Sequence, residues 1–252
     1  MRAILRRLAG RNPRVRAYAR LALRSVVPDR EPEIRILEFL AARGETVIDV
    51  GANVGLYITP LLRMGCRVVA FEANPAIAHE LDLMYGSKIR VIHAAASNVS
   101  GTATMRVPDE VVLGGLGTIE PENTLPESHN RTFEVPTVTI DSLGLTDVAL
   151  IKIDVEGHEL AVLQGAEQLL RTQRPRLIIE AENRHRENAV ASIFEFLGGL
   201  NYEGFMLVDG LLASIRTFDP ARHQSVAEIS VDALNHHQLQ PSYVYNFVFL
   251  PA

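Results

Sequence analysis

The 252-residue chain has no tryptophan, a single cysteine (Cys66) and only 6% aromatic residues. One cysteine excludes an intrachain disulfide and is typical of a protein from a reducing compartment. No apolar run approaches the roughly 18 residues of a membrane-spanning helix, and the first residues lack the long apolar core and small-residue cleavage site of a signal peptide. We therefore expect a cytoplasmic protein in which Cys66 is a small core residue.

The basic residues are unevenly distributed. Residues 1–24 contain eight arginines and no acidic residue, although the whole chain has a net charge of −5 at pH 7. The rest of the chain is therefore strongly acidic, which argues against a nucleic-acid partner. The arm is predicted to be a helix packed on its own domain or on a partner subunit, as in a homo-oligomer. Because apolar residues are interleaved with its arginines, the alternative is an amphipathic helix that lies on an anionic membrane surface.

From residue 31 onward, strand patterns alternate with helical patterns, which predicts an α/β domain with a parallel sheet and helices on both faces. Strands are expected at residues 45–50, 67–72, 88–94, 102–107, 131–138, 148–153, 176–181, 202–208 and 243–250. Helices are expected at residues 31–42, 56–64, 75–85, 159–170 and 187–197. In the first helix, the residues predicted to face the core are Ile34, Leu37, Phe39 and Leu40. We predict one domain over residues 31–252, preceded by a basic arm at residues 1–30.

The turn DVGANVG, Asp49–Gly55, joins the first strand to a helix. Two glycines and an asparagine at the tip of a buried strand indicate a ligand close to the backbone, because these residues tolerate left-handed conformations. The spacing G-x-x-x-G differs from the dinucleotide pattern G-x-G-x-x-G, and no nucleoside-triphosphate P-loop is present. A purely structural turn would need glycines too.

Glu72 ends the second strand, 21 residues after Gly51. An acid at this place can accept hydrogen bonds from both ribose hydroxyls, in NAD and in S-adenosylmethionine alike. The helix that begins near Val54 would stabilise a negative group at its N-terminus, either a pyrophosphate or the methionine carboxylate. The residues alone leave both cofactors open.

Several segments resemble the FkbM family of S-adenosylmethionine-dependent methyltransferases. The most specific is LIKIDVEGHELAVLQGAEQLL, Leu150–Leu170, and the others are Val47–Thr59, Phe71–Pro75, Val135–Leu143, Arg174–Glu182 and Tyr245–Pro251. The resemblance implies a Rossmann-like class I methyltransferase fold, with a seven-stranded, mostly parallel sheet whose last strand is antiparallel.

The resemblance also implies the cofactor contacts. The glycine turn would line S-adenosylmethionine, Glu72 would hold its ribose, and the segment Ala95–Ser97 would flank its adenine. The cofactor-binding candidates are Asp49, Gly51, Ala52, Asn53, Gly55, Glu72, Ala73, Asn74, Ala95, Ala96 and Asp154.

Methyl transfer needs a nucleophile aligned at ~3–3.5 Å and a group that removes its proton. The catalytic candidates Asp154, Glu156 and His158 follow the fourth strand of the parallel sheet. If the chain stays extended, Asp154 and Glu156 share a face. His158 starts the next helix, whose N-terminus favours the neutral imidazole that acts as a base, and Glu159 is expected to cap that helix. The alternative is that the two acids only cap backbone N–H groups and His158 is solvated.

Asp154, Glu182 and Asn183 resemble the acid, acid and asparagine that hold Mg²⁺ in catechol-type O-methyltransferases. A hard cation with oxygen ligands would lower the pKa of an acceptor hydroxyl. The alternative is a polar rim at the strand ends without a metal. Residues 108–131 are predicted to form a lid over the acceptor or a plain loop, and residues 209–242 an insert before the last strand.

The sequence therefore predicts an S-adenosylmethionine-dependent enzyme that O-methylates a hydroxyl or carboxyl group of a sugar, glycan or natural product. N-methylation of an amino sugar and an NAD-binding oxidoreductase are the alternatives. Nucleobase amino-methyltransferases carry an Asp/Asn-Pro-Pro-aromatic signature after the fourth strand of the parallel sheet. This chain has Asp154-Val155-Glu156-Gly157 at that place. This difference also argues against DNA or RNA as the substrate.

Overall fold

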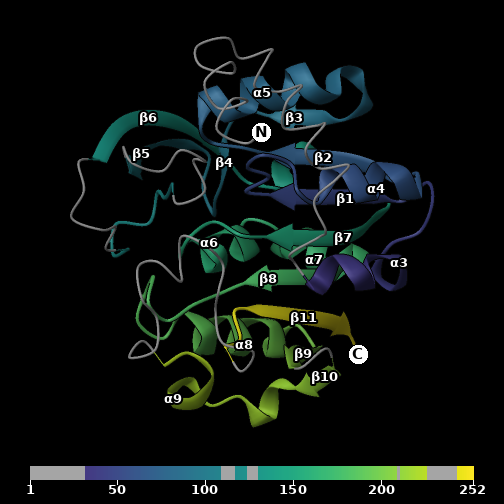
Figure 1. Cartoon of the computed structure of the whole chain (residues 1–252), viewed down its shortest axis with the longest axis vertical. Helices are drawn as coiled ribbons and strands as arrows, with labels where there is room; N and C mark the ends of the chain where they lie inside the picture. The colour runs from purple at the N-terminus through teal and green to yellow at the C-terminus, as the bar shows by residue number, and fades with distance from the viewer. Residues whose placement is uncertain (1–31, 109–116, 124–129, 209–210, 226–242) are drawn as a thin grey trace, which may run out of the picture.

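The computed structural model describes residues 32–108, 117–123, 130–208, 211–225 and 243–252. Its main layer is an eight-stranded sheet with the strand order β10-β9-β11-β8-β7-β1-β2-β3 (Figure 1). The strands are β1 (Thr46–Val50), β2 (Arg67–Phe71), β3 (Arg90–Ile92), β7 (Val148–Ile153), β8 (Arg176–Glu180), β9 (Tyr202–Val208), β10 (Leu211–Ser214) and β11 (Asn246–Pro251).

The strand directions bring several strand ends to one edge of the sheet. β1 pairs in parallel with β2 and β7, β2 pairs in parallel with β3, and β7 with β8. β11 lies between β8 and β9 and is antiparallel to both. The predicted α/β architecture and the antiparallel last strand are thus confirmed. The carboxyl ends of β1, β2, β7 and β8 share one edge, where ligands bind in sheets of this kind.

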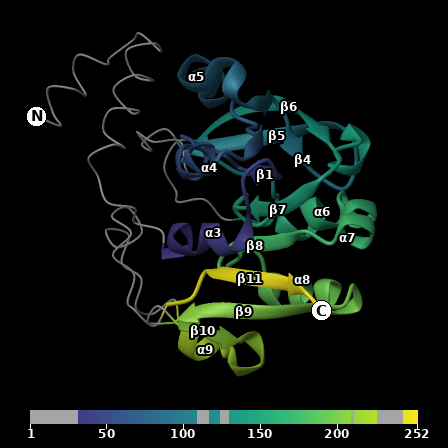
Figure 2. The same cartoon turned by 90° about the vertical axis from the view of Figure 1, so that its right-hand side faces the viewer.

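Helices cover both faces of this sheet (Figure 2). One face carries α3 (Leu37–Leu40), α4 (Ile58–Met64) and α5 (Pro75–Tyr85), and the other carries α6 (Glu159–Gln164), α7 (Glu167–Gln173) and α8 (Ala189–Gly199). Every residue of β1 is buried. The first core lies under α3, α4 and α5 and includes Val47, and the second lies under α6, α7 and α8 and includes Ile48. The two residues point to opposite faces because successive strand side chains alternate. Cys66 is buried and unoxidised in the first core, as predicted.

A second, three-stranded sheet with the order β4-β6-β5 lies beside the strand ends. Its strands are β4 (Ala95–Ala96), β5 (Gly101–Pro108) and β6 (Asn130–Val138), and the strands predicted at 102–107 and 131–138 pair with each other as antiparallel β5 and β6. Gly165, between α6 and α7, allows close contact with this sheet. A Cβ atom at Gly165 would lie 2.0 Å from the carbonyl oxygen of Ser97, so only glycine permits this approach.

The structure differs from four sequence predictions. The helix predicted at 31–42 is a 3-10 helix (Pro32–Ile36) followed by the short α3. The sheet has eight strands rather than seven, because β10 adds to the edge by pairing antiparallel with β9. The helix predicted at 159–170 is two helices, interrupted at Gly165. Phe39 was predicted to face the core but is 75% exposed, while Leu37 and Leu40 are buried, because two residues advance ~200° around a helix.

Several predicted regions fall wholly or partly outside the described residues. These are the arm at 1–30, residues 109–116 and 124–129 of the predicted lid, and residues 209–210 and 226–242 of the predicted insert. The described part of the insert forms β10, a 3-10 helix (Ile215–Thr217) and α9 (Pro220–His223). None of the described helices combines the length and apolar character that a membrane crossing requires.

Candidate active site

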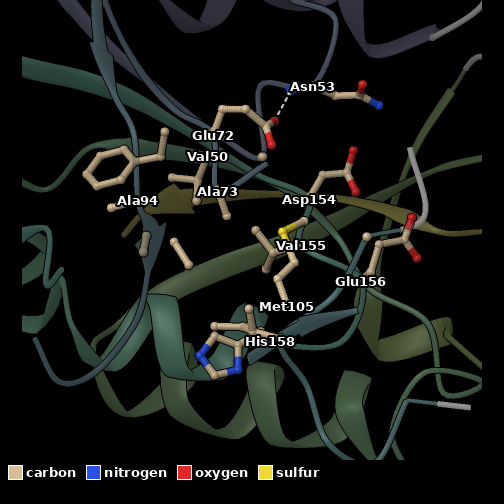
Figure 3. Close-up of a pocket in the computed structure, with 16 residues that line it drawn as sticks. Val50, Asn53, Glu72, Ala73, Ala94, Met105, Asp154, Val155, Glu156 and His158 are labelled. Carbon is tan, nitrogen blue, oxygen red and sulfur yellow. Dashed lines mark hydrogen bonds between the residues drawn. The ribbon is translucent and has the colours of Figure 1, made fainter. Parts of the chain in front are cut away.

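A pocket opens at the carboxyl ends of β1, β2 and β7, bounded on the other side by the second sheet (Figure 3). Its walls therefore come from both sheets. The lining residues are Val50, Gly51, Asn53, Phe71, Glu72, Ala73, Ala94, Ala95, Ala96, Met105, Gly117, Ile119, Asp154, Val155, Glu156 and His158.

The turn after β1 needs its glycines for two different contacts. Gly51 has φ +74°, and a Cβ atom there would lie 1.8 Å from the carbonyl oxygen of Asp154. Gly55 has φ +75°, and its missing Cβ faces Ile58, Leu81 and Tyr85. Gly51 therefore lets the turn approach the end of β7, whereas Gly55 lets it pack against α4 and α5.

Glu72 is 7% exposed and holds the turn in place. Its Oε2 accepts a hydrogen bond from the backbone N–H of Asn53, and its Oε1 accepts one from that of Asn74, both at 2.8 Å. Burial raises the pKa of Glu72 to about 7, although the two backbone N–H groups lower it and the charges of Asp49 and Asp154 add to the rise. The carboxyl group thus stands at the pocket wall with its orientation fixed by backbone donors.

Asp154 follows β7 and forms an ion pair with the buried Lys152, with 2.9 Å between Oδ2 and Nζ. The Lys152 ammonium also lies over the ring of Tyr57, 5.1 Å from its centroid. Burial lowers the pKa of Lys152, but the carboxylates of Asp154, Asp49 and Glu180 outweigh burial and hold that pKa above its usual value. Lys152 is therefore charged and compensates the acids around it. Figure 3 shows the Asp154 carboxylate on the same side of the pocket as Glu72.

Glu156 does not share a face with Asp154, contrary to the prediction for an extended chain. Its φ is +55°, so the backbone turns after β7. Its Oε2 lies 3.2 Å from Nε2 of His185, and Figure 3 shows its carboxyl group directed away from the centre of the pocket. Burial, and then the charge of Asp154, raise the pKa of Glu156 well above its usual value.

His158 occupies the N-cap position of α6 and is held through both ring nitrogens. Nδ1 lies 3.2 Å from Oε2 of Glu120, and Nε2 lies 3.0 Å from Oγ of Ser97. Because a carboxylate only accepts, Nδ1 carries a proton. The predicted capping role of Glu159 is confirmed, since its Oε1 accepts a hydrogen bond from the N–H of Gly157 at 2.8 Å.

Residues 117–123, inside the predicted lid, contact the site directly. The Asn123 side-chain amide donates to the carbonyl oxygen of Glu156 at 2.7 Å and to Nδ1 of His185 at 3.0 Å. The Thr118 hydroxyl donates to the same carbonyl oxygen at 2.9 Å. Arg106 of β5 donates to the backbone carbonyls of Glu120, Pro121 and Asn123. The segment is thus anchored between the two sheets.

The residues predicted to hold Mg²⁺ do not fit that role. Glu182 accepts hydrogen bonds from Arg184 at 2.6 and 2.8 Å and from the Tyr243 hydroxyl. Burial raises the pKa of Glu182, but its hydrogen bonds from His185 and Arg184 outweigh burial and lower it to about 2. Oδ1 of Asn183 accepts from the N–H of Val190 at 3.2 Å. Of the three predicted ligands only Asp154 lines the pocket, and the described residues contain no cluster of three or more His, Cys, Asp or Glu suited to a metal ion.

The structure brings most predicted site residues to this pocket. Those that line it are Gly51, Asn53, Glu72, Ala73, Ala95, Ala96, Asp154, Glu156 and His158, whereas Asp49, Ala52, Gly55 and Asn74 lie outside its lining. Sequence reasoning missed Met105, Gly117 and Ile119 of the second sheet region, together with the histidine partners Glu120 and Asn123. The one available signal was the position of Glu120 and Asn123 inside the predicted lid.

Comparisons with known proteins agree with this geometry. Residues 49–205, well over half of the chain, match the family described as Methyltransferase FkbM domain. The chain is 27% identical over 143 residues to the hexuronic acid methyltransferase AglP of Haloferax volcanii, an alignment that covers 55% of this chain and 57% of that protein.

A solved structure has the same fold. The methyltransferase FkbM from Methylobacillus flagellatus KT superposes with a TM-score of 0.52 at 18% identity, over 98% of this chain and 57% of that one. This likeness confirms the predicted Rossmann-like class I methyltransferase fold. The chain spans a little over half the length of both relatives. On the family match, the chain belongs to the FkbM methyltransferase family.

Proposed function

We propose that the protein is an S-adenosylmethionine-dependent methyltransferase that O-methylates a hydroxyl or carboxyl group of a sugar, glycan or natural product. The observation that carries this proposal is the pocket itself. It joins a glycine turn and two acids, Glu72 and Asp154, at the carboxyl ends of three neighbouring strands. Family membership supports methyl transfer over the NAD-dependent alternative.

Different parts of the pocket suit different parts of the cofactor. Glu72 would accept hydrogen bonds from the ribose hydroxyls with its remaining lone pairs, and the turn at Gly51–Asn53 would receive the methionine portion. The small or flexible apolar side chains at the opposite end would enclose the adenine: these are Ala94, Ala95, Ala96, Met105 and Ile119. Asp49 and Asn74 would act indirectly, through Lys152 and through Glu72.

Asp154 is the proposed catalytic base. When bound, the cofactor supplies an electrophilic methyl group, and the chain must align the acceptor and remove its proton. The Asp154 side chain is 29% exposed, and Lys152 keeps a positive charge beside it. Glu156 is less suited to removing a proton, because its carboxyl group pairs with His185 and is directed away from the centre of the pocket (Figure 3). It would instead donate or accept a hydrogen bond at the acceptor. A step through Mg²⁺ is not part of the proposal, and turnover should be unchanged by EDTA.

The proposed class of acceptor rests on the similarity to the methyltransferase AglP. The relative's name states that it methylates a hexuronic acid, which supports a sugar acceptor here. A screen with isotopically labelled S-adenosylmethionine and candidate sugars, followed by mass spectrometry, tests this. A label on oxygen supports the proposal, and a label on nitrogen of an amino sugar would replace it with the N-methyl alternative.

A thermal-shift measurement tests the cofactor separately. We expect the melting temperature to rise with S-adenosylhomocysteine and not with NADH. The reverse result would overturn the proposal. Asp154→Asn should bind S-adenosylhomocysteine as the wild type does and lose roughly 10²–10⁴-fold in turnover, the contribution of a positioned base. Cytoplasmic location, and contact of residues 1–24 with a membrane or a subunit, stay predictions.

A further inference from the structure

His158 was predicted to be a catalytic base, but its surroundings point elsewhere. A base in its neutral form needs one ring nitrogen free to accept the proton of the acceptor. Here Nδ1 donates to Glu120, and Nε2 lies 3.0 Å from the Ser97 hydroxyl, nearer than that hydroxyl's other acceptor, Oδ1 of Asn98, at 3.3 Å. The side chains of His158 and Glu120 are only 15% and 14% exposed. To take a proton from an acceptor, His158 would have to release Ser97.

The position of His158 in the pocket is equally informative. Figure 3 shows the imidazole beside Met105, on the opposite side of the pocket from Glu72 and Asp154. Its partner Ser97 directly follows Ala95 and Ala96, which line the apolar end. The imidazole thus belongs to the apolar end rather than to the acidic one.

We infer that His158, held between Glu120 and Ser97, is a fixed wall of the adenine end of the pocket and takes no proton from the acceptor. This inference rests on the proposed function. With both nitrogens occupied by the protein, the ring contributes to the wall as an aromatic group, which suits an adenine base. The acceptor must approach the methyl carbon in line with the breaking bond. That approach lies beyond the ribose, toward Asp154, and not at the adenine end.

Glu120 is then a positioning residue that acts through His158. Its backbone carbonyl accepts from Arg106, its N–H donates to the Thr118 hydroxyl at 2.9 Å, and its carboxylate accepts from the imidazole. The carboxylate fixes the tautomer and the plane of the ring. Without it, the ring would be free to rotate away from the adenine.

The first test needs no acceptor. Binding of S-adenosylhomocysteine and of 5′-methylthioadenosine, which lacks the amino acid portion, is measured by titration calorimetry. We expect His158→Gln and Glu120→Leu to weaken both ligands by a similar factor, roughly five- to tenfold, the scale of one packing or hydrogen-bond contact. His79→Gln is the matched control, because His79 is exposed on α5 and should bind as the wild type does. Unchanged binding in both site variants would overturn the inference.

Turnover with the acceptor found in the labelling screen separates a wall from a base. At saturating cofactor we expect His158→Gln and His158→Phe to keep kcat within about threefold, with the same pH profile. A loss of 10²-fold or more with a missing inflection in the profile identifies His158 as the base and refutes the inference. If His158→Gln fails to fold, Glu120→Leu carries both measurements. Failure of the wild type to bind S-adenosylhomocysteine would sink the proposed function instead.

Discussion

Lys152 shows how a buried charge can be required by its neighbours. Its ammonium contacts Asp154, interacts with the charge of Asp49 and lies over Tyr57. Removing a buried cation leaves its carboxylate partners without compensation, which is more costly than the pair is stabilising. The chain has only two lysines, and the other, Lys88, is exposed.

We therefore expect Lys152→Met to lower the free energy of unfolding by about 3–5 kcal/mol. Lys88→Met provides a matched control and should change it by less than about 0.5 kcal/mol. Urea denaturation of both variants measures the difference. Equal stability of the two variants would mean that the Asp154 carboxylate does not depend on Lys152.

A second prediction at the scale of single residues concerns Glu72. Glu72→Ala removes the proposed ribose acceptor and the bond that fixes the N–H of Asn53. We expect S-adenosylhomocysteine to bind about 1–3 kcal/mol more weakly, the scale of hydrogen bonds to a charged group. Calorimetric titration measures this, with Glu195→Ala, an exposed change on α8, as the control. An unaltered affinity would remove Glu72 from the cofactor site.

The residue scale also shows where prediction from sequence succeeds. Glu72 and Asp154 were identified because each directly follows a strand whose pattern is local in sequence. Glu120 and Asn123 were not, because they contact His158 and His185 across 38 and 62 residues. Such contacts depend on how the second sheet packs against the first, which no local pattern encodes.

At the scale of elements, the turn after β1 depends on the end of β7. Gly51→Ala would place a Cβ 1.8 Å from the Asp154 carbonyl oxygen while also adopting a positive φ. We expect a loss of at least about 3 kcal/mol in the free energy of unfolding, since a left-handed residue alone costs ~1–2 kcal/mol and the clash adds to it.

Gly144→Ala separates the cost of the left-handed conformation from the cost of the steric clash. Gly144 has φ +57°, but no atom lies within 4 Å of the added Cβ. This control should lose only the ~1–2 kcal/mol of the left-handed conformation. Chemical denaturation of both variants is the measurement, and a similar loss in each would show that the approach to Asp154 is unimportant.

Element bounds were predicted best where the sequence carries a clear start or stop signal. α5 and β9 have the bounds that the sequence predicted, because Pro75 begins the helix and Val208 is followed by the turn-forming pair Asp209-Gly210. The same pair was a signal for a hairpin, and hence for β10, that the prediction did not use. The break at Gly165 coincides with its close approach to Ser97, which directly follows β4 of the other sheet.

At the scale of the whole molecule, the buried acids set the response to pH. Burial raises the pKa of Glu72 and of Glu159 to about 7, above that of an unfolded glutamate. The folded state therefore binds more protons than the unfolded state between about pH 4.5 and 7. Stability from these two groups is present at low pH and is lost as the pH rises through about 7. Glu182, with its lowered pKa, loses its contribution as the pH falls toward about 2.

We thus expect the ligand-free protein to melt at a higher temperature near pH 5 than near pH 8. Each group contributes a slope of at most about 1.4 kcal/mol per pH unit. Calorimetric melting across this range is the measurement. The double variant Glu72→Gln, Glu159→Gln should show a flatter dependence, and a wild-type melting temperature that rises toward pH 8 would contradict the assignment.

The close approach of Gly165 to Ser97 has a consequence for how the protein tolerates change. The pocket draws its lining from both sheets, and this contact is one place where the second sheet meets the helices behind the first. Ligand affinity therefore depends on the relative placement of two layers as well as on the residues that touch the ligand. Substitutions at this junction would alter affinity from a distance, so an engineer who wished to retune the enzyme for another donor or acceptor has a second set of positions to vary.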